Sequence, residues 1–158
     1  MRSKSTLMSL AMVLVTPVAW PAETSYDFSV CTHSKLTMLE ANADVVAFGV
    51  ETWGVVSSST TKEWEGATQH CVGSLRILGG KQSGKGLCKW LDSAGNTAIG
   101  EWEYPASGNN VWTWLAGTGR FKGIGGGGTF KDVFSSAQPA EAGTSQGCRH
   151  DWGKYTLP

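Results

Sequence analysis

The sequence predicts an all-β protein and, more narrowly, a single eight-stranded antiparallel β-barrel held by two disulfides. No stretch has the three- and four-residue apolar spacing of a long amphipathic helix, whereas turn residues recur roughly every eight to twelve positions. All four cysteines follow an apolar leader. Residues 117–130 hold seven of the 21 glycines, which suits the tight turns and close backbone contacts of a closed sheet.

The first residues have the composition of a secretory signal peptide. Arg2 and Lys4 precede a short apolar run, residues 7–15, that is too short to span a bilayer. We predict a signal peptide over residues 1–22, with cleavage between 19 and 24, and one β-barrel domain over residues 23–158. The protein is therefore expected to be exported, to the periplasm or outside the cell, with no integral membrane segment after signal removal.

The exported chain would be mildly acidic. Loss of Arg2 and Lys4 lowers the basic count from 13 to 11, against 13 acidic residues. Nucleic acids and anionic lipids recruit clustered lysine and arginine, so neither is predicted as a partner. With 158 residues, of which 41% are hydrophobic, the chain is long enough for the core of one domain.

Eight strands are predicted between turns rich in Gly, Pro, Asn, Asp and Ser. They are residues 24–32, 44–57, 69–78, 85–91, 97–104, 111–115, 128–134 and 146–157. Residues 35–43 have helix-compatible composition and are predicted to form a helical turn or a loop. Eight antiparallel strands can close into a barrel that is filled by side chains or holds one small ligand.

An even number of cysteines in an exported chain predicts two disulfides. Cys71 and Cys88 flank the predicted hairpin turn at residues 79–84, so on antiparallel strands they would lie nearly opposite each other. Cys31 and Cys148 then remain, one near each end of the domain. Their bridge would tie the first strand to the last, as closure of a barrel requires.

The glycine-rich segment resembles the signature of a known family. Trp-Thr-Trp at 112–114 is followed by GTGRFKGI at 117–124, more glycine, and Thr129-Phe130. This is similar to the GTG-(K/R)-(F/Y)-x-G-(I/M) segment of allene oxide cyclase barrel-like and dirigent-like proteins of the calycin group, and closest to uncharacterised exported bacterial members. The resemblance implies an eight-stranded barrel with an apolar mouth or lumen.

Characterised members of this family cyclise a small hydrophobic molecule without a cofactor, or guide the stereochemistry of its reaction. The resemblance implies an activity of this kind. None of their catalytic residues can be matched here by motif, so the resemblance implies the fold more than the activity. No cofactor is expected.

Gly117, Gly119 and Gly123 form a G-x-G-x-x-x-G pattern that invites comparison with a phosphate-binding loop. Such a loop needs a following helix, and none is expected here. We therefore interpret the three glycines as a structural turn between the sixth and seventh strands, with Phe121 and Ile124 as plugs of one barrel end.

Tryptophan is unusually frequent. Seven follow the leader: Trp53, Trp64, Trp90, Trp102, Trp112, Trp114 and Trp152. Any one of them can be explained as barrel filling, but seven exceed what packing needs, and several could line an aromatic pocket. Trp112 and Trp114 share a strand face and are the first candidates for ligand binding, followed by Trp53 and Trp90.

Glu51 is the candidate catalytic residue. It shares a face of the second strand with Trp53, and a carboxylate against an aromatic ring in a dry pocket would serve as a general acid or base. Arg149 and Asp151 share a face of the last strand and are interpreted as a surface ion pair.

His33 and His150 each lie two residues beyond a cysteine. Antiparallel pairing of Cys31 with Cys148 would place the two histidines on opposite sides of the bridge, and no carboxylate accompanies either in a recognisable spacing. No metal site is therefore predicted.

Three functions are compatible with these features. The leading hypothesis is an exported β-barrel that binds a small hydrophobic or aromatic molecule without a cofactor. The first alternative is a cofactor-independent cyclase or isomerase of a small hydrophobic substrate, with Glu51 as its catalyst. The second is a structural or interaction module of the envelope with a filled barrel, for which a homo-oligomer is a further possibility.

Overall fold

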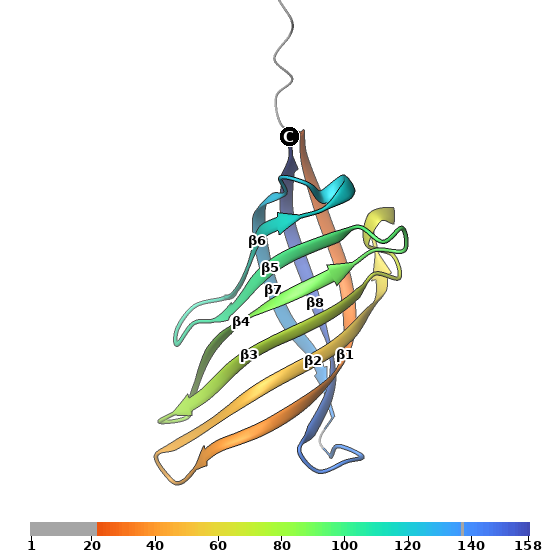
Figure 1. Ribbon diagram of the computed structural model, residues 1–158. Coiled ribbons are helices and arrows are strands. Elements are labelled where there is room, and N and C mark those ends of the chain that lie inside the picture. Colours follow the sequence, from red (N-terminus) through yellow and green to blue (C-terminus); the bar gives the residue numbers. More distant parts are fainter. Residues whose placement is uncertain (1–21, 137) are drawn as a thin grey trace, which may run out of the picture.

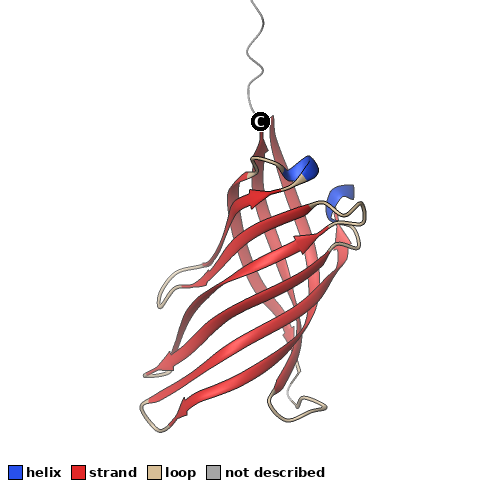
Figure 2. Cartoon of the chain, viewed as in Figure 1, coloured by secondary structure: helices blue, strands red, loops and turns tan. Residues whose placement is uncertain are grey.

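The computed structural model describes residues 22–136 and 138–158, which form a closed eight-stranded antiparallel barrel (Figures 1 and 2). The strands follow one another around the barrel in chain order, and the last pairs with the first. They are β1 Ala22–Ala41, β2 Val45–Ser59, β3 Thr68–Leu78, β4 Lys81–Leu91, β5 Thr97–Tyr104, β6 Asn110–Gly117, β7 Gly125–Ser135 and β8 Thr144–Leu157. The predicted fold class is confirmed.

Two short 3-10 helices, η1 Lys62–Trp64 and η2 Gly119–Phe121, lie at the end of the barrel where β1 begins and β8 ends (Figure 1). We call this the closed end. The opposite, open end carries the turns that follow β1, β3 and β5. No helix among residues 22–136 and 138–158 is long and apolar enough to cross a membrane. Apart from Ala22, the predicted signal peptide lies outside the described residues.

The prediction of a helical turn or loop at residues 35–43 is wrong over residues 35–41, because β1 continues to Ala41 and the loop begins only after it. In this part of β1, Leu36 pairs with Val50 and Met38 pairs with Phe48 of β2. Cross-strand pairing with a long neighbouring strand outweighs the local helical preference of this segment. β1 therefore extends past its last pair with β8, which joins Lys35 to Thr144.

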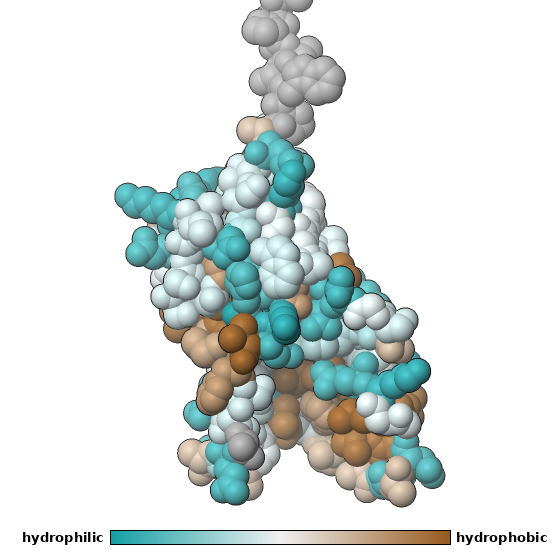
Figure 3. Space-filling model, turned by 180° about the vertical axis from the view of Figure 1, so that it is seen from behind, coloured by the Kyte–Doolittle hydropathy of each residue, from teal (hydrophilic) through white to brown (hydrophobic). Residues whose placement is uncertain are grey.

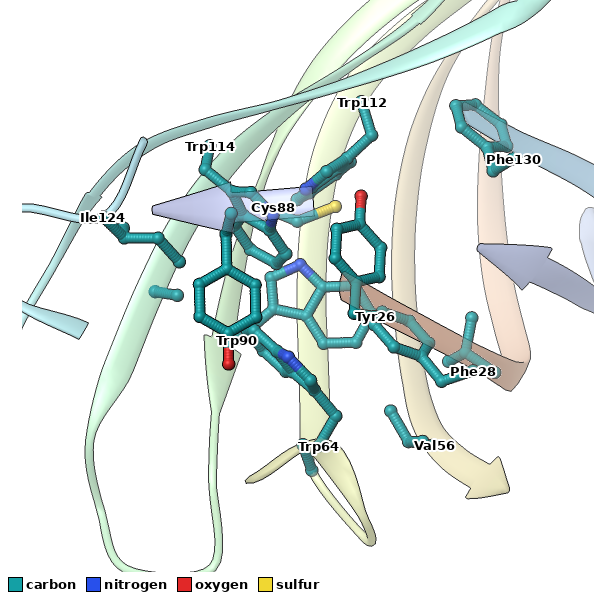
Figure 4. Close-up of a cluster of buried hydrophobic side chains, with 14 of the residues drawn as sticks. Tyr26, Phe28, Val56, Trp64, Cys88, Trp90, Trp112, Trp114, Ile124 and Phe130 are labelled. Atoms are coloured by element: carbon teal, nitrogen blue, oxygen red, sulfur yellow. The ribbon is translucent and has the colours of Figure 1, made fainter. Parts of the chain in front are cut away.

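Aromatic side chains fill the closed half of the barrel (Figure 4). The side chain of Trp64, contributed by η1, is fully buried. Its ring stacks on Trp114 with a centroid distance of 4.9 Å and on Phe121 with a distance of 4.8 Å. Trp90 meets Trp112 edge-on at 5.9 Å. This end of the barrel is a packed aromatic core.

The glycine-rich segment turns the chain toward the aromatic core of the closed half. Gly119 and Gly123 have φ values of +55° and +77°, a backbone conformation that glycine adopts far more readily than other residues. A Cβ at Gly117 would collide with the carbonyl oxygen of Phe121. Phe121 and Ile124 are buried in the aromatic core, which is where the sequence placed them.

Both predicted disulfides are confirmed. Cys31–Cys148 joins β1 to β8 and spans 117 residues of sequence. Cys71–Cys88 joins β3 to β4 across their hairpin, and both of its cysteines are buried. The first bridge therefore links the two strands at which the barrel closes, and the second is buried in the interior of the barrel.

A buried carboxylate ties η2 to the turn between β4 and β5. The side chain of Asp92 is fully shielded from solvent and accepts hydrogen bonds from Ala94 N, from Asn96 N and Nδ2, and from Arg120 Nε at 2.6 Å. Burial by itself would raise the pKa of Asp92, but the hydrogen bonds from Asn96 and the Arg120 charge outweigh it and lower the pKa.

We expect Asp92→Asn to lower the free energy of unfolding by about 2 to 3 kcal/mol at pH 7, because the charged hydrogen bonds are lost. A carboxyl whose folded pKa is lowered stabilises the fold above its unfolded pKa of about 3.9 and loses that effect on further acidification. The variant should therefore approach the wild type in acid. Urea unfolding at several pH values measures this, with Asp44→Asn, at an exposed turn position, as the control. Equal losses in both variants would contradict the prediction.

Candidate functional site

The open half of the barrel contains a cavity of about 270 Å³. Its apolar walls come from inward-facing residues of five strands: Leu36, Phe48, Val50, Leu75, Trp102 and Phe134. The hydroxyl residues Thr32, Ser34, Thr52 and Ser145, on the adjacent strands β8, β1 and β2, also line the cavity. In the view from behind, hydrophobic residues gather about a hollow between two projections at this end (Figure 3).

The cavity opens through the mouth of the barrel. A second hollow of about 520 Å³ shares Phe48, Leu75 and Tyr104 with the first, and it extends to Leu39 and Pro105. Pockets for small ligands usually measure about 300 to 1,000 Å³. The inner cavity is slightly smaller than this range and therefore suits only a small molecule.

A buried ion pair lies at the inner end of the cavity. Arg149 Nε donates to Asp151 Oδ2 at 2.9 Å, and Arg149 Nη2 donates to Gln69 Oε1 at 3.0 Å. The guanidinium also lies 5.1 Å from the ring centroid of Phe130. Only 2% of the Asp151 side chain is exposed. An arginine has five N–H donors, so Arg149 keeps donors for a ligand beyond these two bonds.

The interpretation of Arg149 and Asp151 as a surface pair is wrong. The two residues do share a face of β8, but that face is the inner one, because Asp151 pairs with the buried Phe28 and Arg149 with the buried Val30. Burial raises the pKa of Asp151, an effect that Arg149 opposes by its charge and hydrogen bond.

A tyrosine and a second carboxylate form the polar part of the wall. The hydroxyl of Tyr104 donates to the carboxylate of Asp132, whose Oδ2 lies 3.0 Å away. Burial raises the pKa of Tyr104, and the negative charge of Asp132 raises it further. The phenol therefore remains protonated at neutral pH. Arg149, Tyr104 and Asp132 together give the cavity groups that could bind the polar end of a ligand or move a proton.

The four tryptophans predicted to bind ligand do not border the cavity. Trp90, Trp112 and Trp114 come together in the packed closed half, where each is at most 3% exposed. Trp53 lies on the outer surface, 42% exposed, between the rings of His33 and His70 at 6.5 and 5.3 Å. A ligand-binding role for these residues remains a prediction that their positions do not support.

Glu51 also lies on the outer surface. Its side chain is 44% exposed, and its Oε1 lies within hydrogen-bond distance, 2.8 Å, of His70 Nε2. Glu51 and Trp53 do share a face of β2, as expected, but the dry surroundings that general acid–base catalysis would need are absent around this carboxylate. The catalytic role of Glu51 therefore remains untested and has no support from its position.

Sequence reasoning missed the residues that border the cavity, notably Trp102, Tyr104 and Asp132. A signal for two of them was present, because Trp102 and Tyr104 alternate with Glu101 and Glu103 along one strand. The signal for Asp132 was absent, since β7 is glycine-rich and its alternation is weak. Among the described residues, no group of three or more His, Cys, Asp or Glu side chains could hold a metal ion.

The eight antiparallel strands form a β-barrel that is packed with side chains at one end and contains a cavity with polar and apolar walls at the other. Neither a family model nor a curated protein matches the sequence. Among solved structures, the chain is similar to that of the pterocarpan synthase dirigent protein GePTS1. The TM-score is 0.50 at 10% identity, over 89% of this chain and 94% of the other. At this identity the likeness shows the fold alone, which is a dirigent-like barrel.

Proposed function

We propose that this protein binds a small hydrophobic or aromatic molecule, without a cofactor, in the cavity of the open half. The observation that carries the proposal is the division of the barrel into two halves. Aromatic rings fill the closed half, whereas the inward side chains of the open half leave about 270 Å³ free. A barrel that served only as a rigid module would have no need of such a hollow, which favours binding over the envelope-module hypothesis.

The walls of the cavity suggest how a ligand is oriented. Phe48, Val50 and Leu75 offer apolar surface to its body. Arg149 and the Tyr104–Asp132 pair offer hydrogen bonds to a polar group of the ligand. A few polar groups in a mainly apolar pocket usually fix the orientation of a ligand.

A pair of Val→Phe variants tests the proposal. Val50 faces the cavity and Val72 faces outward, 50% exposed, on the neighbouring strand. We expect one- and two-ring aromatic compounds to bind the wild type in isothermal titration calorimetry. Val50→Phe should weaken binding at least tenfold, because its ring occupies the cavity, whereas Val72→Phe should bind as the wild type does. Absence of binding by the wild type, or equal binding by both variants, would refute the proposal.

The second candidate function is a cofactor-independent isomerase or cyclase acting in the same cavity. Asp132, hydrogen-bonded to Tyr104 at the wall, favours it, since a carboxylate beside a protonated phenol can accept a proton from a bound molecule and return it elsewhere. Conversion of a bound compound into an isomer of equal mass, followed by NMR, separates catalysis from binding. This candidate does not require Glu51.

We also propose that the protein is exported. The apolar leader carries this proposal, and the two disulfides are compatible with it, because such bridges persist in oxidising compartments. Mass spectrometry of the protein secreted by cells would show whether the chain begins between residues 20 and 25.

A further inference from the structure

The charged residues that border the cavity differ in how well a ligand can reach them. Within the described part of the chain, these residues are Asp132 and Arg149, which are cross-strand partners on β7 and β8. Asp132 is exposed, whereas only 11% of the Arg149 side chain is exposed. A ligand in the cavity therefore reaches the carboxylate more readily than the guanidinium.

The positive charge of Arg149 is already offset by a partner. Its Nε donates to the buried carboxylate of Asp151, its Nη2 donates to Gln69, and its guanidinium lies against the ring of Phe130. Each of these contacts holds the guanidinium on the barrel wall. Arg149 is therefore largely covered and paired with a charge of opposite sign.

The negative charge of Asp132 has no such partner. Among residues 22–136 and 138–158, the hydrogen-bond donor to its carboxylate is the neutral hydroxyl of Tyr104, 3.2 Å from Oδ1 and 3.0 Å from Oδ2. No ion pair in this part of the chain includes Asp132. A carboxylate has about four acceptor sites, so Asp132 can accept further hydrogen bonds. The polar part of the cavity thus carries a surplus negative charge on its accessible residue.

We propose that the cavity selects aromatic molecules with a cationic polar end, such as a primary amine on a short alkyl chain, and that Asp132 binds the ammonium group. An ammonium group has three N–H donors, and its hydrogen bonds to a carboxylate are stronger than those between neutral groups. A carboxylate on the ligand would instead be repelled by Asp132. This inference rests on the proposed function, since it names the ligand class of the same cavity.

Three probes that share a phenylethyl group test the proposal at pH 7. They are 2-phenylethylamine, which is protonated as a lysine side chain is, the neutral 2-phenylethanol, and the anionic 3-phenylpropionate. Calorimetric titrations compare the wild type with Asp132→Asn, which removes the charge and keeps the shape. The control is Asp27→Asn, the same substitution at a side chain that is 52% exposed and does not border the cavity.

The wild type should bind the amine most tightly and the carboxylate least tightly. Asp132→Asn should weaken binding of the amine about three- to tenfold and leave binding of the alcohol nearly unchanged. Asp27→Asn should change none of the three affinities. Equal or tighter binding of 3-phenylpropionate by the wild type, or the same loss of amine binding in both variants, would overturn the role of Asp132.

A measurement on the wild type alone covers the case in which Asp132→Asn does not fold. In NMR spectra with bound 2-phenylethylamine, nuclear Overhauser effects should connect the methylene group next to its nitrogen to the ring protons of Tyr104, which donates to Asp132. Binding of the amine without these effects would place the ammonium group elsewhere and overturn the inference. Binding of 2-phenylethanol tests the proposed function independently of charge, and a wild type that binds none of the three probes would overturn both.

Discussion

Replacement of Cys31 and Cys148 together by alanine is expected to lower the free energy of unfolding by about 4 to 5 kcal/mol. The bridge closes a loop of 117 residues between the first and last strands, so its loss frees nearly the whole unfolded chain. It also releases the seam at which β1 and β8 close the barrel. Urea unfolding under oxidising conditions measures the change.

The matched control is the double alanine variant at Cys71 and Cys88. This bridge spans only 17 residues, and the hairpin of β3 and β4 already holds its ends together. A loss of about 3 kcal/mol is expected from the shorter loop. If the Cys31 and Cys148 variant lost less than about 1 kcal/mol, the seam would be held by strand pairing and packing alone.

The second large effect is expected at Arg149. The variant Arg149→Met keeps much of the side-chain volume but leaves the carboxyl of Asp151 buried without its charged partner. Breaking a buried pair in this way typically costs about 3 to 5 kcal/mol. Urea unfolding at pH 7 should show a loss of this size, and the Gln69 amide oxygen would lose its hydrogen bond as well.

The loss in Arg149→Met should depend on pH. Burial already raises the pKa of Asp151, and removal of the arginine raises it further. A carboxyl with a raised folded pKa destabilises the folded state only at pH values above about 3.9, because only there is the same carboxyl ionised in the unfolded chain. The difference between variant and wild type should therefore be largest near pH 7 and shrink toward pH 4, where Asp151 is protonated in the folded variant.

Lys154→Met is the control for this prediction, because it makes the same type of change on the same strand. Lys154 pairs with Glu23 at 2.6 Å, but both side chains are more than half exposed. Exposed pairs contribute about 1 kcal/mol or less, so a small and nearly pH-independent change is expected. A similar loss in both variants would mean that the Arg149 pair is hydrated in solution.

Much of the architecture could be predicted because it depends on short-range patterns. The turn residues separate the strands, and the hairpin places Cys71 opposite Cys88. The error at residues 35–43 arose where local composition and long-range pairing disagree. There, β1 extends because it pairs with β2 up to the pair Ala41–Val46. This pairing cannot be predicted from the composition of residues 35–43 alone.

The cavity was harder to predict, because alternation sorts residues into two faces without saying which face is inside. Glu51 and Trp53 share one face, and Arg149 and Asp151 share another, as expected. Only closure of the barrel decides that the first pair lies outside and the second inside. The assignment depends on the curvature of the whole sheet, which no single strand encodes.

By itself the sequence determined the strand order, the two bridges and the glycine turn that leads Phe121 into the plug, because each depends on residue spacing or on backbone conformations that glycine favours. The tertiary structure alone decided where the tryptophans lie. Trp90, Trp112 and Trp114 fill the closed half, whereas Trp102 lies along the wall of the open half. The physical reason is that a ring occupies the space that its cross-strand neighbours leave, and at Trp102 this space lies over Gly73 and Gly86 on two neighbouring strands.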